Sequence, residues 1–201
     1  MRKTRSRLVT VGILAGLLLS VLIGSAVGKY VTTVSVSGKV TFTASLAENV
    51  QLLEHKAEPN ADGSYTLSKT ETTATNEYIL LPGLDIPKDP YIKITGKTPI
   101  ASYLFLVVEG NLGNDSGISY DLADCWKPVE GNDDVYVYSD STGAVAITPE
   151  TEGIDKIEII ENNMVYVSQK LADTLTDVEL NFSAVLKEIG EGTTPAEVYN
   201  R

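Results

Sequence analysis

The sequence contains very little of the chemistry from which catalytic and metal sites are usually built. Its 201 residues include a single cysteine, Cys125, and a single histidine, His55. One cysteine excludes a disulfide within the chain and a CxxC zinc clip, and one histidine excludes a metal site with two histidine ligands. We therefore predict that the chain has no metal site of these types.

Enzyme chemistry that depends on histidine would have to use His55. Glu54-His55 is the only place in the sequence where a zinc-peptidase motif could begin. The helical HExxH arrangement, however, needs a second histidine one turn later. A Ser-His-Asp triad would recruit the same histidine, and the chain has no GxSxG sequence. We therefore predict that the protein is not an enzyme, and that His55 is an exposed or edge-strand histidine without a catalytic role.

Acidic residues outnumber basic ones and are unevenly distributed. The chain has 27 Asp and Glu against 16 Lys and Arg, a formal charge of −11. Residues 1–28 hold four of the basic residues and no acidic one, so the remaining chain has 12 basic and 27 acidic residues and a formal charge of −15. Such a body is repelled by nucleic-acid phosphates and anionic lipid headgroups, which argues against nucleic acid as a partner.

Residues 1–28 have the layout of a secretory signal peptide. A basic start, Met1–Arg7, precedes the almost wholly apolar Leu8–Ile23, and small residues follow. Cleavage after Ala26 or after Gly28 places small residues where signal peptidase reads them. The alternative is an uncleaved anchor, because 21 residues from position 8 onward carry no charge and are long enough to span a bilayer. Both interpretations place the body outside the cytoplasmic membrane, as a secreted or cell-surface protein.

Alternation of apolar and polar residues dominates the remaining chain and is typical of β-strands. Residues 34–46 are apolar at nearly every even position, and Val178–Leu186 repeats this pattern. Tyr103–Val108 is apolar on both faces and predicts a central strand. Shorter candidate strands are Val50–His55, Ser64–Thr70, Glu77–Leu81, Tyr91–Thr95, Val135–Ser139, Ala144–Thr148, Ile157–Ile160 and Met164–Ser168.

Turn-forming residues separate these strands. Gly, Asn, Asp and Pro gather at Pro59–Gly63, Pro82-Gly83, Gly110–Gly117, Gly131–Asp134 and Ser141–Gly143. About ten short strands at this spacing predict an all-β fold, an antiparallel β-sandwich of the jelly-roll or immunoglobulin type behind an N-terminal signal helix. Helix is otherwise expected only as a turn or two at Gln169–Leu175 and Pro195–Asn200, and the alternative for the first segment is a loop between strands. Residues 29–201 are expected to form a single domain.

Calcium is the one cofactor that the composition leaves open. Acidic residues gather in predicted loops at Asp115, at Asp121 and Asp124, and at Asp133-Asp134. Carboxylate-rich loops of exported proteins can hold Ca²⁺ at roughly millimolar affinity, but Asp is also an ordinary turn former and no segment has EF-hand spacing. We expect no cofactor, with weak calcium binding as the alternative.

Cys125 and Trp126 lie next to each other between strands. A lone thiol in an exported protein is either buried as a small hydrophobic residue or paired between chains. We expect burial, with Trp126 closing one end of the sandwich.

Residues 29–46 are a candidate for exchange between molecules. An N-terminal strand with one apolar face can leave its own domain and complete the sheet of another copy through main-chain hydrogen bonds. The side chains expected to enter the acceptor are Val34, Val36, Val40 and Phe42. The alternative is that the segment is only the first strand of its own sandwich, and Gly38 or Lys39 can mark a bulge or a register stop in it.

Several segments together resemble a known family. Beside the signal and the alternating strand after it, the similar segments are Leu81–Pro90 (with Pro-Gly ahead of Lys-Asp-Pro), Tyr91–Ile94, Tyr103–Glu109, Tyr120–Trp126, Tyr136–Tyr138 and Leu180–Ala184. In these segments the chain resembles exported Firmicutes proteins with the SipW-dependent type of signal, which are related to the biofilm fibre protein TasA and to camelysin. The likeness covers most of residues 77–186 and, more loosely, residues 1–46.

The resemblance implies a jelly-roll sandwich and a function in self-assembly. The best-understood relatives polymerise into surface fibres, and their subunits can join by donating an N-terminal strand to the next subunit. We expect a secreted structural protein that self-associates into biofilm-matrix fibres, with signal peptidase as a partner during export. The alternatives are a camelysin-like exported metallopeptidase and a surface module that presents loops to a ligand.

Overall fold

The computed structural model describes residues 49–72, 76–110, 112, 116–171 and 178–201, and the backbone alone of residues 34–35 and 38–40. The predicted signal peptide, with Ala26 and Gly28, lies outside the described residues, as do Val36 and Phe42. The described residues form an all-β fold, as predicted, in which most strand pairs are antiparallel. Neither helix among the described residues is long and apolar enough to cross a membrane.

The largest sheet consists of β1 (Val34–Ser35), β2 (Gly38–Val40), β7 (Ser102–Gly110), β9 (Trp126–Val129), β10 (Asn132–Asp140), β11 (Gly143–Ala144), β12 (Ala146–Ile147) and β15 (Val178–Glu188). Its centre is the antiparallel pair of β15 and β7. β10 and β12 pair with the other edge of β7, and β9 and β11 pair with β10. β1 and β2 lie on the opposite side, along β15, and run parallel to it.

The second sheet consists of β3 (Val50–Pro59), β4 (Tyr65–Thr72), β6 (Tyr91–Ile94) and β13 (Ile154–Glu158). Its strands are antiparallel in the order β13-β6-β3-β4. The hairpin of β3 and β4 is closed by the turn predicted at Pro59–Gly63, where Gly63 adopts a φ of 85° that glycine accommodates without strain.

A third, small sheet consists of β5 (Ile86–Pro87), β8 (Ile118–Ser119) and β14 (Met164–Val167). β14 is its middle strand and follows the short 3₁₀ helix η2 (Glu161–Asn163) directly.

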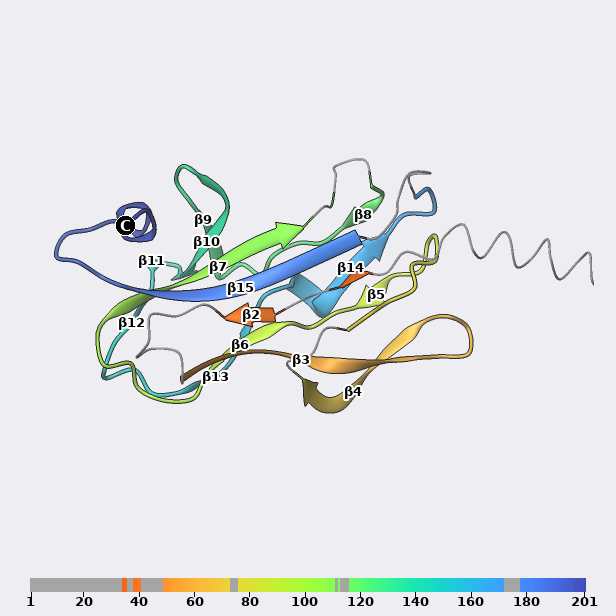
Figure 1. Cartoon of the computed structure of the whole chain (residues 1–201), viewed down its shortest axis with the longest axis horizontal. Coiled ribbons are helices and arrows are strands. Elements are labelled where there is room, and N and C mark those ends of the chain that lie inside the picture. Colours follow the sequence, from red (N-terminus) through yellow and green to blue (C-terminus); the bar gives the residue numbers. More distant parts are fainter. Residues whose placement is uncertain are drawn as a thin grey trace, which may run out of the picture.

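The two larger sheets face each other and give the molecule a sandwich-like architecture (Figure 1). Side chains from both sheets meet in one core, among them Leu52 and Ile92 from the second sheet and Leu106 and Phe182 from the largest. β2 lies between β15, with which it pairs, and β3, which it contacts (Figure 1).

The pattern expected for the two central strands is confirmed. Every second residue of β15 from Val178 to Leu186 is buried, and the residues between them are half-buried or exposed. β7 is buried on both faces at its centre, because consecutive residues Leu104, Phe105 and Leu106 have no accessible surface.

A smaller core covers the outer face of the largest sheet. Phe105 and Val137 pack there with helix α2 (Pro195–Tyr199), which begins with a capping box at Thr194. The helix predicted near the C-terminus is therefore confirmed. Residues 169–171 of the other predicted helix are not helical, and the rest of that helix lies outside the described residues.

One predicted strand, Glu77–Leu81, is wrong. The segment contains a single bridge residue and no strand. The side chain of Asn76 occupies the edge of β3 instead: its Oδ1 accepts from the Ala57 N–H at 3.0 Å, and its Nδ2 donates to the His55 carbonyl at 2.8 Å. The alternation there reflects burial of Tyr78 and Leu80 rather than strand pairing.

The core tolerates truncation of Phe182 poorly, because this ring is inaccessible to solvent. We expect Phe182→Ala to lower the free energy of unfolding by about 3–5 kcal/mol through lost burial and cavity formation. Guanidinium chloride unfolding, followed by the fluorescence of the sole tryptophan, Trp126, measures the loss. Tyr166→Ala, at a ring that is 38% exposed, is the control and should cost less than about 1 kcal/mol. Equal losses in both variants would contradict the central position of Phe182.

Candidate functional site

The N-terminal segment, defined here as residues 34–40, forms an outer edge of the largest sheet. β1 pairs Val34 with Val178, and β2 pairs Gly38 with Phe182. Both strands are parallel to β15, the last strand of the chain. The described part of the segment is therefore bound to the sheet mainly through main-chain pairing with one strand.

The register of this pairing does not change along the N-terminal segment. Val34 and Gly38 are four residues apart, and so are their partners Val178 and Phe182. A bulge or register stop at Gly38 or Lys39 is therefore wrong, because glycine is accommodated here within a continuous parallel register.

Two of the four predicted assembly residues lie opposite buried positions of β15. Val34 is paired with Val178 and Val40 with Ala184, and both partners belong to the main core. Val36 and Phe42 lie outside the described residues. The pairing thus brings the expected apolar positions to the stretch of β15 that contributes to the core.

A buried polar cluster, defined as Glu54, Asn76, Lys88 and Asp89, lies beside β3. Lys88 is fully buried, and its Nζ donates to Oε2 of Glu54 at 2.7 Å. The other carboxylate oxygen of Glu54 accepts from the Asn76 backbone N–H at 3.1 Å. Burial lowers the pKa of Lys88, and the nearby Glu54 and Asp89 carboxylates oppose that shift. The two charges of the Lys88–Glu54 pair are thus held together away from water.

Asp89 fixes His55 from two directions. One carboxylate oxygen accepts from the His55 backbone N–H at 3.0 Å, and the other lies 2.6 Å from Nδ1 of the ring. An acid orients imidazole in the same way in a catalytic triad. In the part of the chain that the structure describes, however, no hydroxyl or thiol hydrogen bonds to this ring.

The expectation of an exposed or edge-strand histidine at position 55 is wrong only about exposure, because the His55 side chain is 28% exposed. His55 pairs with Glu71 of β4, but the pairing of β3 with β6 ends at Leu53, so the other edge of β3 is bound here by the side chains of Asp89 and Asn76. The backbone bond to Asp89 holds β3 at the point where β6 begins, which gives the histidine a structural role.

The segment Leu81–Pro90, which carries much of the family resemblance, connects three elements through its polar groups. Asp85 accepts from the Val167 N–H of β14 at 3.0 Å, and the Lys88 N–H donates to the Asn163 carbonyl at 2.8 Å. Sequence reasoning assigned these residues no role. The available signal was a pair of charged residues between prolines directly ahead of an apolar strand, because charged residues that are buried must be paired.

The acidic residues considered as calcium ligands are dispersed. The four of them that the structure describes are all exposed: Asp121, Asp124, Asp133 and Asp134. Asp115 lies outside the described residues. Asp140 instead accepts from the hydroxyl and the N–H of Thr142, which lowers the pKa of Asp140. Among the described residues, no three His, Cys, Asp or Glu side chains are grouped so that they could hold a metal.

Cys125 and Trp126 differ in burial. Trp126 is buried, as expected, and its Nε1 donates to the Glu158 carbonyl at 2.7 Å. Cys125 is only half-buried, and burial raises the pKa of its thiol. The thiol borders a hollow of about 350 Å³ whose other lining residues are Asp124, Lys127, Ser139, Asp140 and Ser141.

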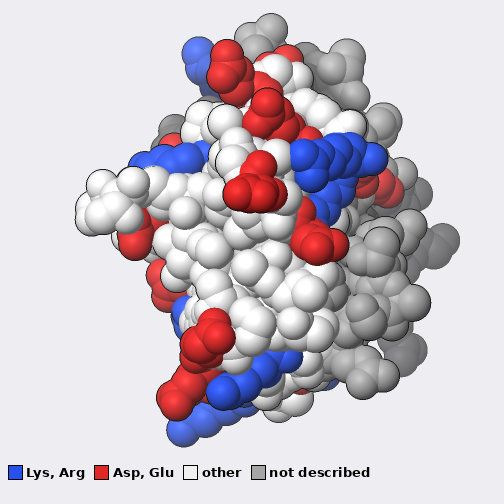
Figure 2. Space-filling model, turned by 90° about the vertical axis from the view of Figure 1, so that its left-hand side faces the viewer, with Lys and Arg blue, Asp and Glu red and all other residues white. Residues whose placement is uncertain are grey.

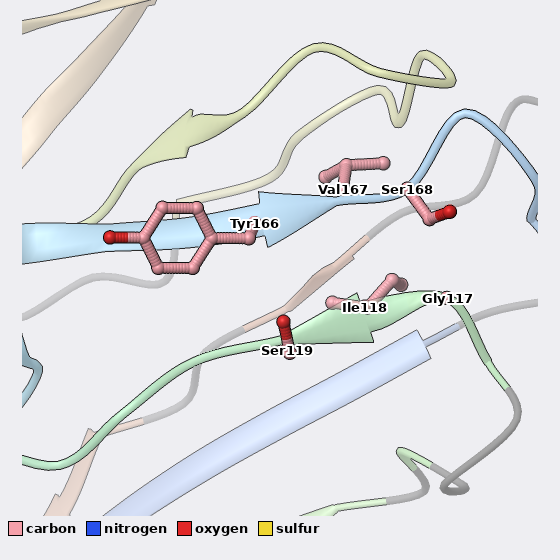
Figure 3. Close-up of a pocket in the computed structure, with 6 residues that line it drawn as sticks. All are labelled: Gly117, Ile118, Ser119, Tyr166, Val167 and Ser168. Carbon is pink, nitrogen blue, oxygen red and sulfur yellow. The ribbon is translucent and has the colours of Figure 1, made fainter.

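A second hollow, of about 320 Å³, lies along β8 and β14 (Figure 3). Its lining residues are Gly117, Ile118, Ser119, Tyr166, Val167 and Ser168. Hydroxyl groups are the only polar side-chain atoms in this lining. The hollow therefore lacks the acid, base or metal ligand that hydrolysis requires.

Charged side chains of both signs are interspersed at one end of the molecule, around a largely uncharged area (Figure 2). No single sign of charge dominates this face. It therefore offers no strong field that would select a highly charged ligand.

Removal of one partner from the buried ion pair should destabilise the protein strongly. We expect Lys88→Met to lower the free energy of unfolding by about 3–5 kcal/mol, because the Glu54 carboxylate remains buried without its cation. Lys156→Met is the matched control: its ion pair with Glu158 is of similar length, 2.9 Å, but its side chains are 40% and 47% exposed. The control should cost less than about 1 kcal/mol. Equal losses in denaturant titrations would contradict the argument from burial.

The Cys125 thiol should react slowly in the folded protein. A raised pKa leaves less thiolate at a given pH, so alkylation at pH 8 should be about tenfold or more slower than in the urea-unfolded chain. The rate should rise with pH until the raised pKa is passed. Iodoacetamide labelling followed by mass spectrometry measures both states, and equal rates would contradict the effect of burial.

Comparison of the chain with known proteins finds no match among family models, curated proteins or solved structures.

Proposed function

We propose that the protein is an exported structural protein that self-associates by exchanging its N-terminal segment between copies, with fibres of a biofilm matrix as the product. The observation that carries this proposal is the parallel pairing of residues 34–35 and 38–40 along β15. The layout of residues 1–28 supports export through a signal peptidase, and the resemblance to TasA-like proteins supports the fibrous product.

Exchange replaces each main-chain hydrogen bond within one molecule by the same hydrogen bond between two molecules. The N-terminal segment precedes β3 in the chain, so it can pair with β15 of a second copy while the rest of both domains stays folded. The same main-chain hydrogen bonds form within one molecule or between two, each contributing about 1 kcal/mol net. Protein concentration then decides between the closed monomer and the exchanged chain.

A vacated β15 is a strong acceptor. Departure of the N-terminal segment releases the edge of β15 that pairs with residues 34–35 and 38–40, in a sheet whose inner side chains belong to the core. Such an edge favours the addition of another strand. The formal charge of −15 on residues 29–201 disfavours non-specific aggregation, so that association depends on this edge.

We propose further that the sandwich belongs to the jelly-roll or immunoglobulin-like class. The order of elements supports this assignment, because the chain passes repeatedly between sheets: β6 is in the second sheet, β7 in the largest and β8 in the third. Such crossings are typical of Greek-key sandwiches. The peptidase alternative lacks support among the described residues, where no three His, Cys, Asp or Glu side chains are grouped so that they could hold a metal.

Cysteine trapping tests exchange directly, because the register pairs Lys39 with Ser183. In a Cys125→Ser background of residues 29–201, Lys39→Cys and Ser183→Cys chains are mixed, assembled and oxidised. We expect disulfide-linked heterodimers in the assembled material on non-reducing gels, because only exchange joins these positions between different chains. Electron microscopy of the same samples reports whether fibres form.

The matched control mixes Lys39→Cys with Lys187→Cys, which lies four residues further along β15. This pair is out of register and should give little heterodimer. Fibres without trapping of the registered pair would contradict strand exchange. Fibres of unchanged yield from a chain that lacks residues 29–46 would contradict it as well.

A further inference from the structure

Lys88 and Glu54 meet the geometric requirement for a bond between side chains. The Nζ atom lies 2.7 Å from Oε2, and Oε2 is bonded directly to Cδ. The nitrogen is thus within contact range of the carboxyl carbon, close to the separation of about 3–3.5 Å from which bond formation proceeds. The two residues are 34 positions apart in sequence, Glu54 on β3 and Lys88 in the connection from β5 to β6.

Burial of this pair favours its neutral form, although the Glu54 and Asp89 carboxylates favour the charged amine. The side chains are 0% and 7% exposed, so water has little access. An ammonium group has three hydrogens to donate, but among the described residues Glu54 is its one hydrogen-bond acceptor. Burial also lowers the pKa of Lys88, which favours the neutral amine, the nucleophilic form of lysine.

The geometry points to an isopeptide bond between Nζ of Lys88 and Cδ of Glu54, formed by the folded chain itself. One proton moves from Nζ to Oε2, and the lone pair of the neutral amine attacks Cδ. A second Nζ proton then passes to Oε2, the Cδ–Oε2 bond breaks, and that oxygen leaves as water. The product is a secondary amide, and no oxidant, reductant or cofactor takes part.

The backbone of Asn76 assists this step. Its N–H donates to Oε1, the oxygen that stays on Cδ and becomes the amide carbonyl, at 3.1 Å. Negative charge develops on this oxygen when the amine attacks, and a fixed N–H donor stabilises it. The Asn76 side chain is anchored to the backbone of β3 through Ala57 and His55, so the donor is held in place before the reaction.

Condensation is favoured here although it is unfavourable between separate molecules in water. A reacting pair held in contact behaves as if its partner were present at about 10⁵–10⁸ M. Formation of the amide also removes two buried charges, whose desolvation opposes folding. The crosslink joins β3 covalently to the segment ahead of β6 and does not depend on the proposed exchange of the N-terminal segment.

Intact-mass spectrometry of the purified mature chain tests the bond. We expect a mass about 18 Da below that of the sequence, the loss of one water. Proteolysis should release a branched peptide that joins the Glu54 and Lys88 segments. A chain of full mass, or a loss of water mapped elsewhere, such as an imide at Asp62-Gly63, would overturn the proposal.

Variants and refolding separate the crosslink from other modifications. Lys88→Arg keeps the positive charge but should restore the full mass, whereas Lys156→Arg, at the exposed pair, should retain the loss. If Lys88→Arg does not fold, the wild-type chain still decides: recovered unfolded from inclusion bodies it should have the full mass and lose water only on refolding. Loss of water in the unfolded chain would contradict formation by the folded structure.

Discussion

The fold depends on the pairing of β15 along both of its edges. β7 satisfies one edge by antiparallel pairing, and the N-terminal segment pairs with the other. Alternate residues of β15 extend into the main core, so a loss of pairing on either side affects the same set of buried side chains. The segment that pairs with this edge comes from the opposite end of the chain, so that residues near the two ends of the sequence meet in one sheet.

The buried polar cluster holds elements together by an ion pair and by hydrogen bonds from side chains rather than by strand pairing. Lys88 and Glu54 are buried from water and form an ion pair with each other. The side chains of Asp89 and Asn76 bind backbone groups of β3. Removal of either partner from such a pair leaves an uncompensated buried charge, which strongly destabilises a fold. Leu81–Pro90 is therefore a structural segment, and its charged residues hold together elements that are far apart in the sequence.

Much of the fold was predictable from the sequence, because the period-two pattern follows directly from strand geometry. Val178–Leu186 and Tyr103–Val108 were placed correctly for this reason. Glu77–Leu81 was not, because alternation cannot distinguish a paired strand from an extended segment whose neighbour Asn76 takes the backbone bonds of β3. The partners of Lys88 and His55 were equally inaccessible, since ion pairing across 34 residues depends on topology and leaves no local pattern.

The direction of the N-terminal segment gives any exchanged assembly a polarity. Each copy would offer a strand from one end of its chain and receive one at β15, so that the donating and receiving surfaces differ and the contact is heterologous. Reciprocal exchange closes two copies into a symmetric dimer, whereas exchange that always passes to a further copy generates open filaments or larger rings. A filament built in this way has two unlike tips, one with a vacant sheet edge and one with an unengaged strand. A new copy would bind the first tip through its own N-terminal segment and the second through its own β15.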